Sequence, residues 1–506
     1  MKAIFDEGPP APCPLRFNMA AYVLAAGAEQ PDRTALEVLA APGEVAERWT
    51  YGALREAVLR MAGGLAAAGV GRGDRVLLRL GHSSRFPVVF FAANALGAVP
   101  VPTSPQLGEG EVGRILEDLE PKALVADAPT RLRAPVTIGP GDLDTLSRSE
   151  AAGFAETGAD DPAFIVYTSG TGGRPKGVVH AQRAAWARRM MWDGWYGLGP
   201  GDRVLHAGAF NWTYTLGAGL TDPWAAGATA LIHSGPPDRN IWPRLAALHA
   251  PTIFAAVPGV YRQMLDAPDL RDGFASLRHG LSAGEALPRA VRGAWEGATG
   301  KPIYEALGMS EVSTYISFSP AHPTVPGRAG RPQIGRRVAV VNEDGSPVEV
   351  GESGILAVSR RDPGLMLGYW RREAETEAAF RGEWFLTGDR AILHDDGTIS
   401  HLGRADDLMN AGGFRVDPAE VEAALLEHPA VAEAAAVERQ VREGVNVIAV
   451  AWVAAPGAEA SEAELAAHCA ERLARYKQPR LFRRVGSLPV GPTGKLLRRR
   501  IRDETW

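Results

Sequence analysis

Apolar and polar positions along the chain follow two periods, one typical of helices and one typical of strands. Residues 17–28 are expected to form an amphipathic helix, and residues 48–71 begin as a strand (RWTY) and continue as a long Ala- and Leu-rich helix. Residues 75–80 (RVLLRL) predict a strand and residues 84–97 predict a helix. Further strands are expected at 99–102, 124–128, 163–167 and 203–208. Strands that alternate with helices of this length indicate a parallel α/β sheet.

The last 90 residues follow a different order. A helical stretch over 418–429 is followed by two strand patterns, 431–437 and 446–455, and then by a helical stretch over 461–473. This order predicts a small α+β unit. The expected fold class is therefore α/β, with a large N-terminal domain built on parallel-type sheets and a small C-terminal α+β domain.

Composition narrows the class of protein. The chain has 506 residues, enough for roughly three domain-sized units, of which 46% are hydrophobic and 22% charged. A net charge of −5 gives no reason to expect nucleic acid as a partner. The two cysteines exclude a disulfide framework and favour a reducing, cytoplasmic location. No apolar run approaches the ~20 residues that span a bilayer, so no stable membrane insertion is expected.

The stretch YTSGTGGRPKGVVH, residues 167–180, carries the strongest chemical signal. It combines glycines, which let the backbone approach a ligand, with three hydroxyls and an ammonium, a set suited to polyphosphate. The alternative is a flexible surface hairpin. The GxxxxGK[ST] loop is excluded by Pro175 and Gly177, and Pro175 also excludes GxGxxG. The residues expected at the phosphates are Thr168, Ser169, Gly170, Thr171, Gly172, Gly173 and Lys176.

A second motif points to another class of enzyme. Residues 280–284 (GLSAG) fit GxSxG, the nucleophile elbow of α/β-hydrolases, and a helical stretch with an early proline follows it. This motif supports the alternative hypothesis of a serine hydrolase with Ser282 as nucleophile. Against it, matches over five residues are common by chance, and the glycine-rich stretch would have no role.

The glycine-rich stretch resembles the signature YTSGTTGxPKG of the adenylate-forming superfamily, which includes acyl-CoA and aryl-CoA synthetases. It departs from that signature at Gly172, where the family usually has Thr. Further motifs appear in the family's order: EALGMSE at 305–311, TGD at 387–389 and the linker at 401–422. The resemblance implies ATP, Mg²⁺ and coenzyme A as cofactors.

The resemblance also implies roles for individual residues. Glu311, with Thr171, would hold Mg²⁺, which prefers oxygen ligands from one or two carboxylates together with phosphate. Asp389 would accept the ribose hydroxyls and Arg404 would contact ribose or phosphate. The expected nucleotide contacts also include Gly284, Glu285, Ala286, Glu305, Ala306, Leu307, Gly308, Met309 and Ser310. The expected acid pocket comprises Phe210, Trp212, Thr213, Tyr214 and Gly308, and the glycine at 308 predicts an open tunnel that takes acids larger than acetate.

The family's linker and C-terminal motif imply a moving domain. Asp406 matches the pivot, and Gly412 and Gly413 match a loop that reaches the site for thioester formation. Lys495, in a basic tail, would be the catalytic lysine that stabilises charge near the α-phosphate, with Thr168 and Glu311 also catalytic. The chain would then divide into a large ATP- and acyl-binding domain, 1–403, and a small mobile domain, 404–506.

The implied reaction has two steps, adenylation of a carboxylic acid and transfer of the acyl group to a thiol. Coenzyme A is the favoured acceptor, and a carrier-protein phosphopantetheine is the alternative. An aromatic acid, similar to benzoate, and a medium-chain or branched aliphatic acid remain equal alternatives. A homodimer is the expected assembly if the chain associates.

Overall fold

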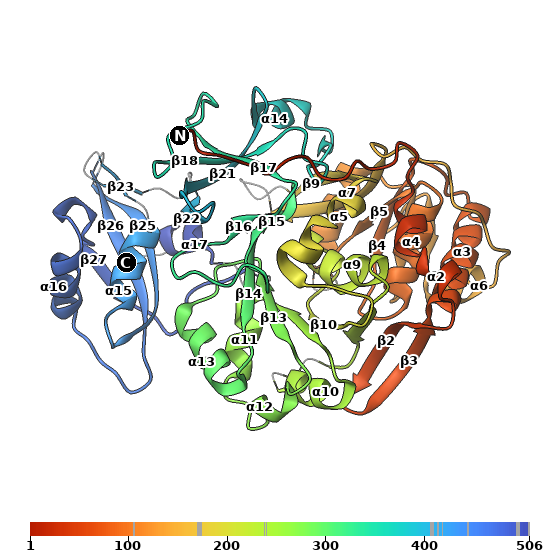
Figure 1. The fold of residues 1–506 in the computed structure, drawn as a ribbon, viewed down its shortest axis with the longest axis horizontal. Coiled ribbons are helices and arrows are strands. Elements are labelled where there is room, and N and C mark those ends of the chain that lie inside the picture. Colours follow the sequence, from red (N-terminus) through yellow and green to blue (C-terminus); the bar gives the residue numbers. More distant parts are fainter. Residues whose placement is uncertain are drawn as a thin grey trace.

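The computed structural model describes residues 1–104, 107–169, 175–236, 238, 240–404, 409–411, 414–416, 418–442, 445–491 and 496–503 (Figure 1). The C-terminal elements, in blue, lie at one end of the molecule and the red and orange segments at the other, while the N-terminus itself lies near the C-terminal part. The predicted α/β class is confirmed by the sheets between these two ends.

A nine-stranded sheet forms the centre of the large part. Its six neighbouring strands from β14 to β2 are parallel, and both edges are extended by antiparallel strands. Apolar residues on one face pack against the helices α10 (Ile241–His249), α11 (Pro258–Met264), α12 (Leu270–Gly273) and α13 (Arg289–Thr299). In spatial order the strands are β16 (Arg331–Pro332), β15 (Ser313–Ser317), β14 (Ile303–Met309), β13 (His279–Ala283), β12 (Ile253–Ala256), β10 (Arg203–Ala207), β11 (Thr229–His233), β2 (Thr34–Ala41) and β3 (Glu44–Thr50).

Over β10, β12, β13 and β14 the opposite face of this sheet is covered by short helices. The chain here forms α7 (Ala184–Ala187), the π-helices η1 (Trp192–Tyr196) and η2 (Gly217–Thr221), and the short helices α8 (Thr213–Leu216) and α9 (Asp222–Ala225). π-helical turns are uncommon in proteins, and those that exist are frequently found at functional sites. We therefore expect a functional site on this face.

A second, four-stranded parallel sheet packs beside the first. Its order is β5 (Val99–Pro102), β4 (Arg75–Arg79), β6 (Ala123–Ala126) and β7 (Val136–Ile138). The surrounding helices are α3 (Tyr51–Ala67), α4 (Arg85–Ala95), α5 (Glu109–Leu119) and α6 (Pro140–Leu146). The predicted helix over 17–28 is instead two short helices, α1 (Met19–Val23) and α2 (Ala26–Glu29). Gly27 explains the compact second turn, because a methyl group there would lie 2.8 Å from the Tyr51 carbonyl oxygen.

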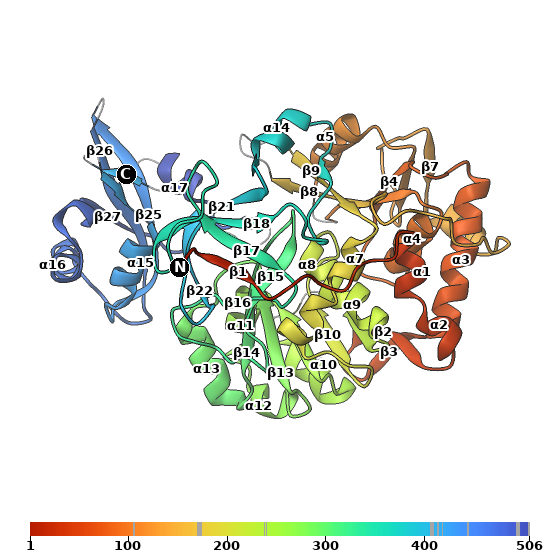
Figure 2. The same ribbon diagram turned by 45° about the horizontal axis from the view of Figure 1, so that its top comes forward.

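The hairpin of β8 (Pro162–Ser169) and β9 (Pro175–Ala181) carries the glycine-rich loop, and β19 (Gly368–Tyr369) pairs with β9. An antiparallel six-stranded sheet lies between this hairpin and the C-terminal elements (Figure 2). Its strands are β1 (Ile4–Asp6), β17 (Arg337–Val341), β18 (Ser353–Ser359), β21 (Trp384–Leu393), β20 (Phe380–Arg381) and β22 (Ile399–Arg404), with α14 (Glu373–Ala378) beside them.

The C-terminal elements build their own core. The predicted helix–strand–strand–helix order is confirmed as α15 (Pro418–Leu426), β25 (Val431–Arg442), β26 (Val445–Ala454) and α16 (Glu462–Arg472). Ser461 caps α16 in a capping box with Glu464. The remaining elements are β23 (Met409–Ala411), β24 (Phe414–Val416), β27 (Leu481–Arg484) and α17 (Arg498–Asp503).

This small core confirms a C-terminal α+β unit, whereas the boundary at residue 403/404 stays a prediction. Arg262 of α11 and Glu433 of β25 form an ion pair that joins the large part to this unit. Within the described ranges, no helix is both long and apolar enough to cross a bilayer.

Candidate active site

The base of the glycine-rich loop is fixed by hydrogen bonds on both strands. Thr168 lies opposite Lys176 in the β8–β9 ladder, and its hydroxyl is 3.4 Å from the Lys176 carbonyl oxygen. The Tyr167 hydroxyl donates to Asp118 at 2.7 Å, and the Arg372 guanidinium bridges Asp118 and the Pro175 carbonyl at 3.4 Å each. The strands on both sides of the loop are therefore anchored to one carboxylate.

One tyrosine joins the loop's lysine to the predicted metal carboxylate. Lys176 Nζ lies 3.6 Å from the ring centroid of Tyr369, a cation–π contact. The Tyr369 hydroxyl donates to Glu311 Oε1 at 2.8 Å. Burial raises the pKa of Tyr369 and the neighbouring Glu311 carboxylate raises it further, so the phenol stays a proton donor. The structure thus brings Thr168, Lys176 and Glu311 together, although they are far apart in sequence.

Glu311 suits a magnesium ion that also binds phosphate. Its Oε2 makes no hydrogen bond to the described part of the chain, while Oε1 is oriented by Tyr369. Among the described residues there is no cluster of three or more His, Cys, Asp or Glu side chains that could enclose a metal. One free carboxylate oxygen is consistent with Mg²⁺, which usually keeps several waters and takes phosphate oxygens as ligands.

The predicted adenine segment turns sharply beside the predicted acid pocket. Gly284 has a φ of +100°, which other residues rarely adopt, and a methyl group on it would lie 3.9 Å from the Trp212 ring. Glu305 lies behind this turn, where its carboxylate accepts from the Leu287 N–H at 2.7 Å and pairs with Arg292. The Glu305 carboxylate thus has protein partners that tie β14 to the 284–287 segment. Its expected contact with the nucleotide stays a prediction.

The rest of the predicted nucleotide set lies nearby. Burial raises the pKa of Glu285, which faces Arg262 and Glu433. Leu307 and Met309 pack against one apolar core cluster, and Ala306 is buried in another. Ala286 and Ser310 lie in the loops that follow β13 and β14.

Gly308 does not face open space, contrary to the expectation of an open tunnel. A methyl group on Gly308 would lie 2.6 Å from the Ser313 carbonyl oxygen and 2.7 Å from Thr314 Cα. The glycine is needed because β15 returns so closely over β14. A tryptophan there would displace β15 instead of closing an empty tunnel, so the side-chain direction at 308 gives no information on acid size.

Asp389 and Arg404, both predicted to contact the ribose, are paired across β21 and β22. Asp389 is buried, and its Oδ1 lies 3.5 Å from Arg404 Nη1 and 3.4 Å from His401 Nε2. Arg404 Nη1 also donates to the Thr387 carbonyl oxygen at 2.9 Å. The predicted pair is therefore assembled by strand register.

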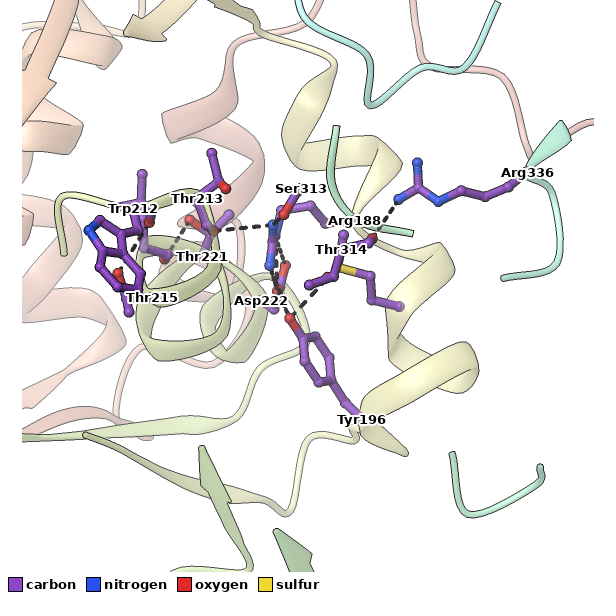
Figure 3. Close-up of polar contacts among 12 residues, drawn as sticks. Arg188, Tyr196, Trp212, Thr213, Thr215, Thr221, Asp222, Ser313, Thr314 and Arg336 are labelled. Atoms are coloured by element: carbon purple, nitrogen blue, oxygen red, sulfur yellow. Dashed lines mark hydrogen bonds and ion pairs between the residues drawn. The ribbon is translucent and has the colours of Figure 1, made fainter. Parts of the chain in front are cut away.

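The predicted acid-pocket residues separate into two groups. Phe210 packs against Phe86 of α4, with ring centroids 5.2 Å apart, and belongs to the main core. Trp212 is the N-cap of α8 and Thr213 its first residue, on the π-helical face (Figure 3). Tyr214 is the second residue of α8. The Tyr214 hydroxyl lies 3.4 Å from the carbonyl oxygens of both Ala256 and Leu281.

A buried ion pair that no sequence motif indicates lies behind Thr213. Arg188 pairs with Asp222 at 2.6 Å, and their side chains are 9% and 1% exposed. Arg188 Nη1 lies 3.4 Å from the Thr213 carbonyl oxygen and 2.6 Å from Ser313 Oγ (Figure 3). The adjoining cavity measures about 20 Å³, roughly the room for one water molecule.

The hydrolase hypothesis is wrong. Ser282 lies inside β13, not at a turn after it, and it is fully buried between the parallel strands β12 and β14. A nucleophile elbow exposes its serine at the end of a strand, so Ser282 has neither the position nor the access that ester hydrolysis requires.

Several predicted residues cannot be placed. Gly170, Thr171, Gly172, Gly173, Asp406, Gly412, Gly413 and Lys495 lie outside the described residues, and for Ser169 the structure describes the backbone only. Their roles stay predictions. Sequence reasoning missed Tyr369 as well as Arg188 and Asp222. A tyrosine after glycine in LGYWRRE was the only local signal, and it is a weak one.

Two family models match the chain: AMP-binding enzyme over residues 24–370 and AMP-binding enzyme C-terminal domain over residues 420–495. The chain is 34% identical to a benzoate–CoA ligase of Thauera aromatica, over 90% of each chain. It is 30% identical to acyl-coenzyme A synthetase ACSM4 of Mus musculus, over 98% of this chain and 92% of that one. Its fold is similar to the crystal structure of a benzoate CoA ligase from Burkholderia xenovorans LB400, with a TM-score of 0.84, 29% identity and coverage of 96% and 100%.

Proposed function

The chain belongs to the AMP-binding enzyme family and is an AMP-forming acyl-CoA ligase, for which we propose a compact aromatic carboxylic acid as substrate. ATP, Mg²⁺ and coenzyme A are its cofactors, and the acid is the remaining substrate. The observation that carries the proposed assignment of residues is the contact series from Lys176 through Tyr369 to Glu311. The Lys176 ammonium lies over the Tyr369 ring and the Glu311 carboxylate accepts from its hydroxyl, which supports assigning phosphate binding to the first group and Mg²⁺ binding to the second.

The buried wall behind the acid pocket favours a compact acid over a long aliphatic one. Beyond Thr213 the space is filled by Arg188 and Asp222, and the cavity that remains holds about one water molecule. An alkyl chain of eight carbons could extend in this direction only by displacing a buried ion pair, which is strongly unfavourable. A single aromatic ring requires no such extension.

In the first half-reaction the acid carboxylate attacks the α-phosphorus of ATP and pyrophosphate leaves. We assign the phosphates to the 168–176 loop, the ribose to Asp389 and Arg404, and the developing charge near the α-phosphate to Lys495. Glu311 would hold Mg²⁺, which neutralises triphosphate charge so that a second anion can approach. Such a displacement needs positioning and electrostatics and no protein nucleophile.

In the second half-reaction the thiol of coenzyme A attacks the acyl carbon of the mixed anhydride and AMP leaves. We propose that the C-terminal unit rotates about Asp406 between the two steps, which removes Lys495 and brings in Gly412 and Gly413. The α11–β25 ion pair is an exposed contact of the kind that domain motion can break.

The test is a panel of acids assayed with ATP, Mg²⁺ and coenzyme A. Benzoate, its hydroxy- and aminobenzoate derivatives, hexanoate and octanoate are compared by AMP, pyrophosphate and thioester formation. We expect AMP and pyrophosphate in equal amounts, with kcat/KM highest for an aromatic acid. A preference for octanoate would contradict the compact pocket, and ADP formation would contradict the reaction.

For location and assembly we propose a cytoplasmic enzyme that associates as a homodimer. Cys13 and Cys469 are both unpaired, as thiols are in a reducing compartment. Sedimentation at micromolar concentration measures the mass of the particle, and a mass of one chain would contradict the dimer.

A further inference from the structure

The hairpin turn between β14 and β15 carries Glu311, and its far end has a strained backbone. Ser313 is not a glycine, yet it has a φ of +70°. This left-handed conformation is unfavourable for a residue with a side chain and is found mostly where surrounding contacts impose it. Because Ser313 lies two residues after Glu311, its conformation sets the course of the turn.

The strained residue is held by the buried arginine. Arg188 Nη1 is 2.6 Å from Ser313 Oγ, the direction in which a guanidinium donates and a hydroxyl accepts (Figure 3). The other nitrogens of the guanidinium are also fixed. Nε donates to the two Asp222 carboxylate oxygens at 2.8 and 2.9 Å, and Nη2 donates to the Tyr196 hydroxyl at 3.0 Å. Arg188 therefore has no alternative position from which to hold Ser313.

The backbone around this network leaves no space for adjustment. A methyl group on Gly217 would lie 1.8 Å from Arg188 Nη2, so η2 can approach the guanidinium only with a glycine there. The next residue along β15, Thr314, is held in the same way, because its carbonyl oxygen accepts from Arg336 at 3.1 Å. Arg336 is itself paired with Asp362 at 2.7 Å, and both side chains are fully buried.

We propose that Arg188 is a positioning residue that links the acid pocket to the metal-binding carboxylate. Through Ser313 Oγ it holds the turn that presents Glu311, and through the Thr213 carbonyl oxygen it holds the start of the acid wall. A shift of one wall is thereby transmitted to the other. This inference rests on the proposed function, since it concerns how Glu311 is placed for Mg²⁺ and ATP.

Two substitutions at one position separate the hydrogen bond from the backbone conformation. Ser313→Ala removes the acceptor and leaves a side chain that disfavours a positive φ. Ser313→Gly removes the same acceptor but adopts a positive φ without strain. We expect Ser313→Ala to raise the Mg²⁺ concentration for half-maximal adenylation about tenfold, since it loses a charge-assisted bond and retains the strain. Ser313→Gly should remain within about twofold of the parent.

Ser317→Ala is the matched control. Ser317 is a buried serine in the same strand, and its hydroxyl donates to the Gly194 carbonyl oxygen at 2.6 Å, away from the turn. This control should lower the melting temperature without changing the Mg²⁺ requirement. Arg188→Lys keeps the positive charge beside Asp222 but loses the branched N–H donors of the guanidinium. If this variant folds, it should reproduce the effect of Ser313→Ala.

The outcomes distinguish the two levels of inference. If the parent protein forms no acyl-adenylate with any acid, the proposed function fails. If the parent is active and Ser313→Ala leaves the Mg²⁺ requirement unchanged, the positioning role is overturned. Equal loss in Ser313→Ala and Ser313→Gly would also support that role, because the lost hydroxyl contact with Arg188, and not backbone strain, would then be responsible.

Discussion

The nucleotide half and the acid half of the candidate active site draw their residues from the sequence in different ways. The nucleotide half uses compact motifs, such as the loop between β8 and β9 and the turn that carries Asp389. The acid half combines Arg188, Thr213, Asp222 and Ser313, which lie on four separate elements. Backbone groups of a contiguous loop can bind phosphate whatever follows them, whereas an acid-binding wall depends on tertiary packing. Motifs therefore predict the nucleotide half, whereas the buried ion pair behind the predicted acid pocket emerges only from the fold.

The largest expected effect concerns the nucleotide half. Lys495→Ala should slow pyrophosphate release from ATP and acid by about 10²–10³-fold, because it removes a positive charge aimed at the developing transition state. Thioester formation from a supplied acyl-adenylate should be retained, as measured by coupled release of AMP. Equal loss in both steps would show that the lysine has no separate role in adenylation.

Tyr369→Phe tests whether the two phosphate-side groups depend on one ring. The substitution keeps the cation–π contact with Lys176 but removes the 2.8 Å hydrogen bond to Glu311. Loss of an outer partner of a metal ligand should raise the Mg²⁺ requirement by about tenfold or more. Tyr261→Phe is the control. Tyr261 lies in α11, and its buried hydroxyl donates to the Phe254 carbonyl oxygen of β12 at 2.9 Å. An identical Mg²⁺ titration for Tyr369→Phe and the parent would contradict the link.

Asp389→Asn should weaken ATP binding more modestly. A neutral amide accepts hydroxyl protons less strongly than a carboxylate, so KM for ATP should rise about fivefold to tenfold. Asp396→Asn is the comparison, because Asp396 bonds within its own turn to Thr398. If both variants raise KM equally, Asp389 is a turn former and not a ribose ligand.

The smallest effect is on stability and concerns buried histidines beside the acid half. Burial lowers the pKa of His206 and of His180 to about 3, so both are neutral in the folded protein. Between pH 6.5 and 3 the unfolded chain binds more protons at these sites, so stability falls as pH falls through that window. In urea titrations at several pH values, His206→Gln should reduce the slope of the free energy of unfolding against pH by up to about 1.4 kcal/mol per pH unit. Substitution of the exposed His322 by Gln should leave that slope unchanged. An unchanged slope for His206→Gln would contradict this assignment.

The sequence predicted the alternation of strands and helices well, because it follows local periodicity. The strands β4, β5, β6, β8 and β10 and the C-terminal unit appear where apolar patterns placed them. Asp389 and Arg404 were predicted separately as ligands of the nucleotide, and the register of β21 and β22 pairs them, while their roles stay predictions. The nine-stranded order could not be predicted, because β2 pairs with β11, where Leu36 lies opposite Ala230, far later in the chain.

Arg188 shows why the ion pair behind the predicted acid pocket escaped detection. Arg188 and Arg189 are adjacent in a stretch with no motif, yet one is buried against Asp222 and the other is exposed beside Trp186, 4.3 Å from its ring. No local property separates these two arginines. The expectation of an open tunnel at Gly308 was wrong for a related reason. The close packing of β15 against Gly308 is a tertiary contact that sequence motifs do not contain.

The ion pair between Arg262 and Glu433 bears on the proposed rotation of the C-terminal unit. An exposed pair is worth about 0–1 kcal/mol, so it biases one arrangement of the two parts without locking it. Dissolved ions weaken such a bias within a distance of about 8 Å at physiological salt. Added salt should therefore shift the proportion of molecules in each orientation while leaving the loop and its anchoring carboxylate untouched.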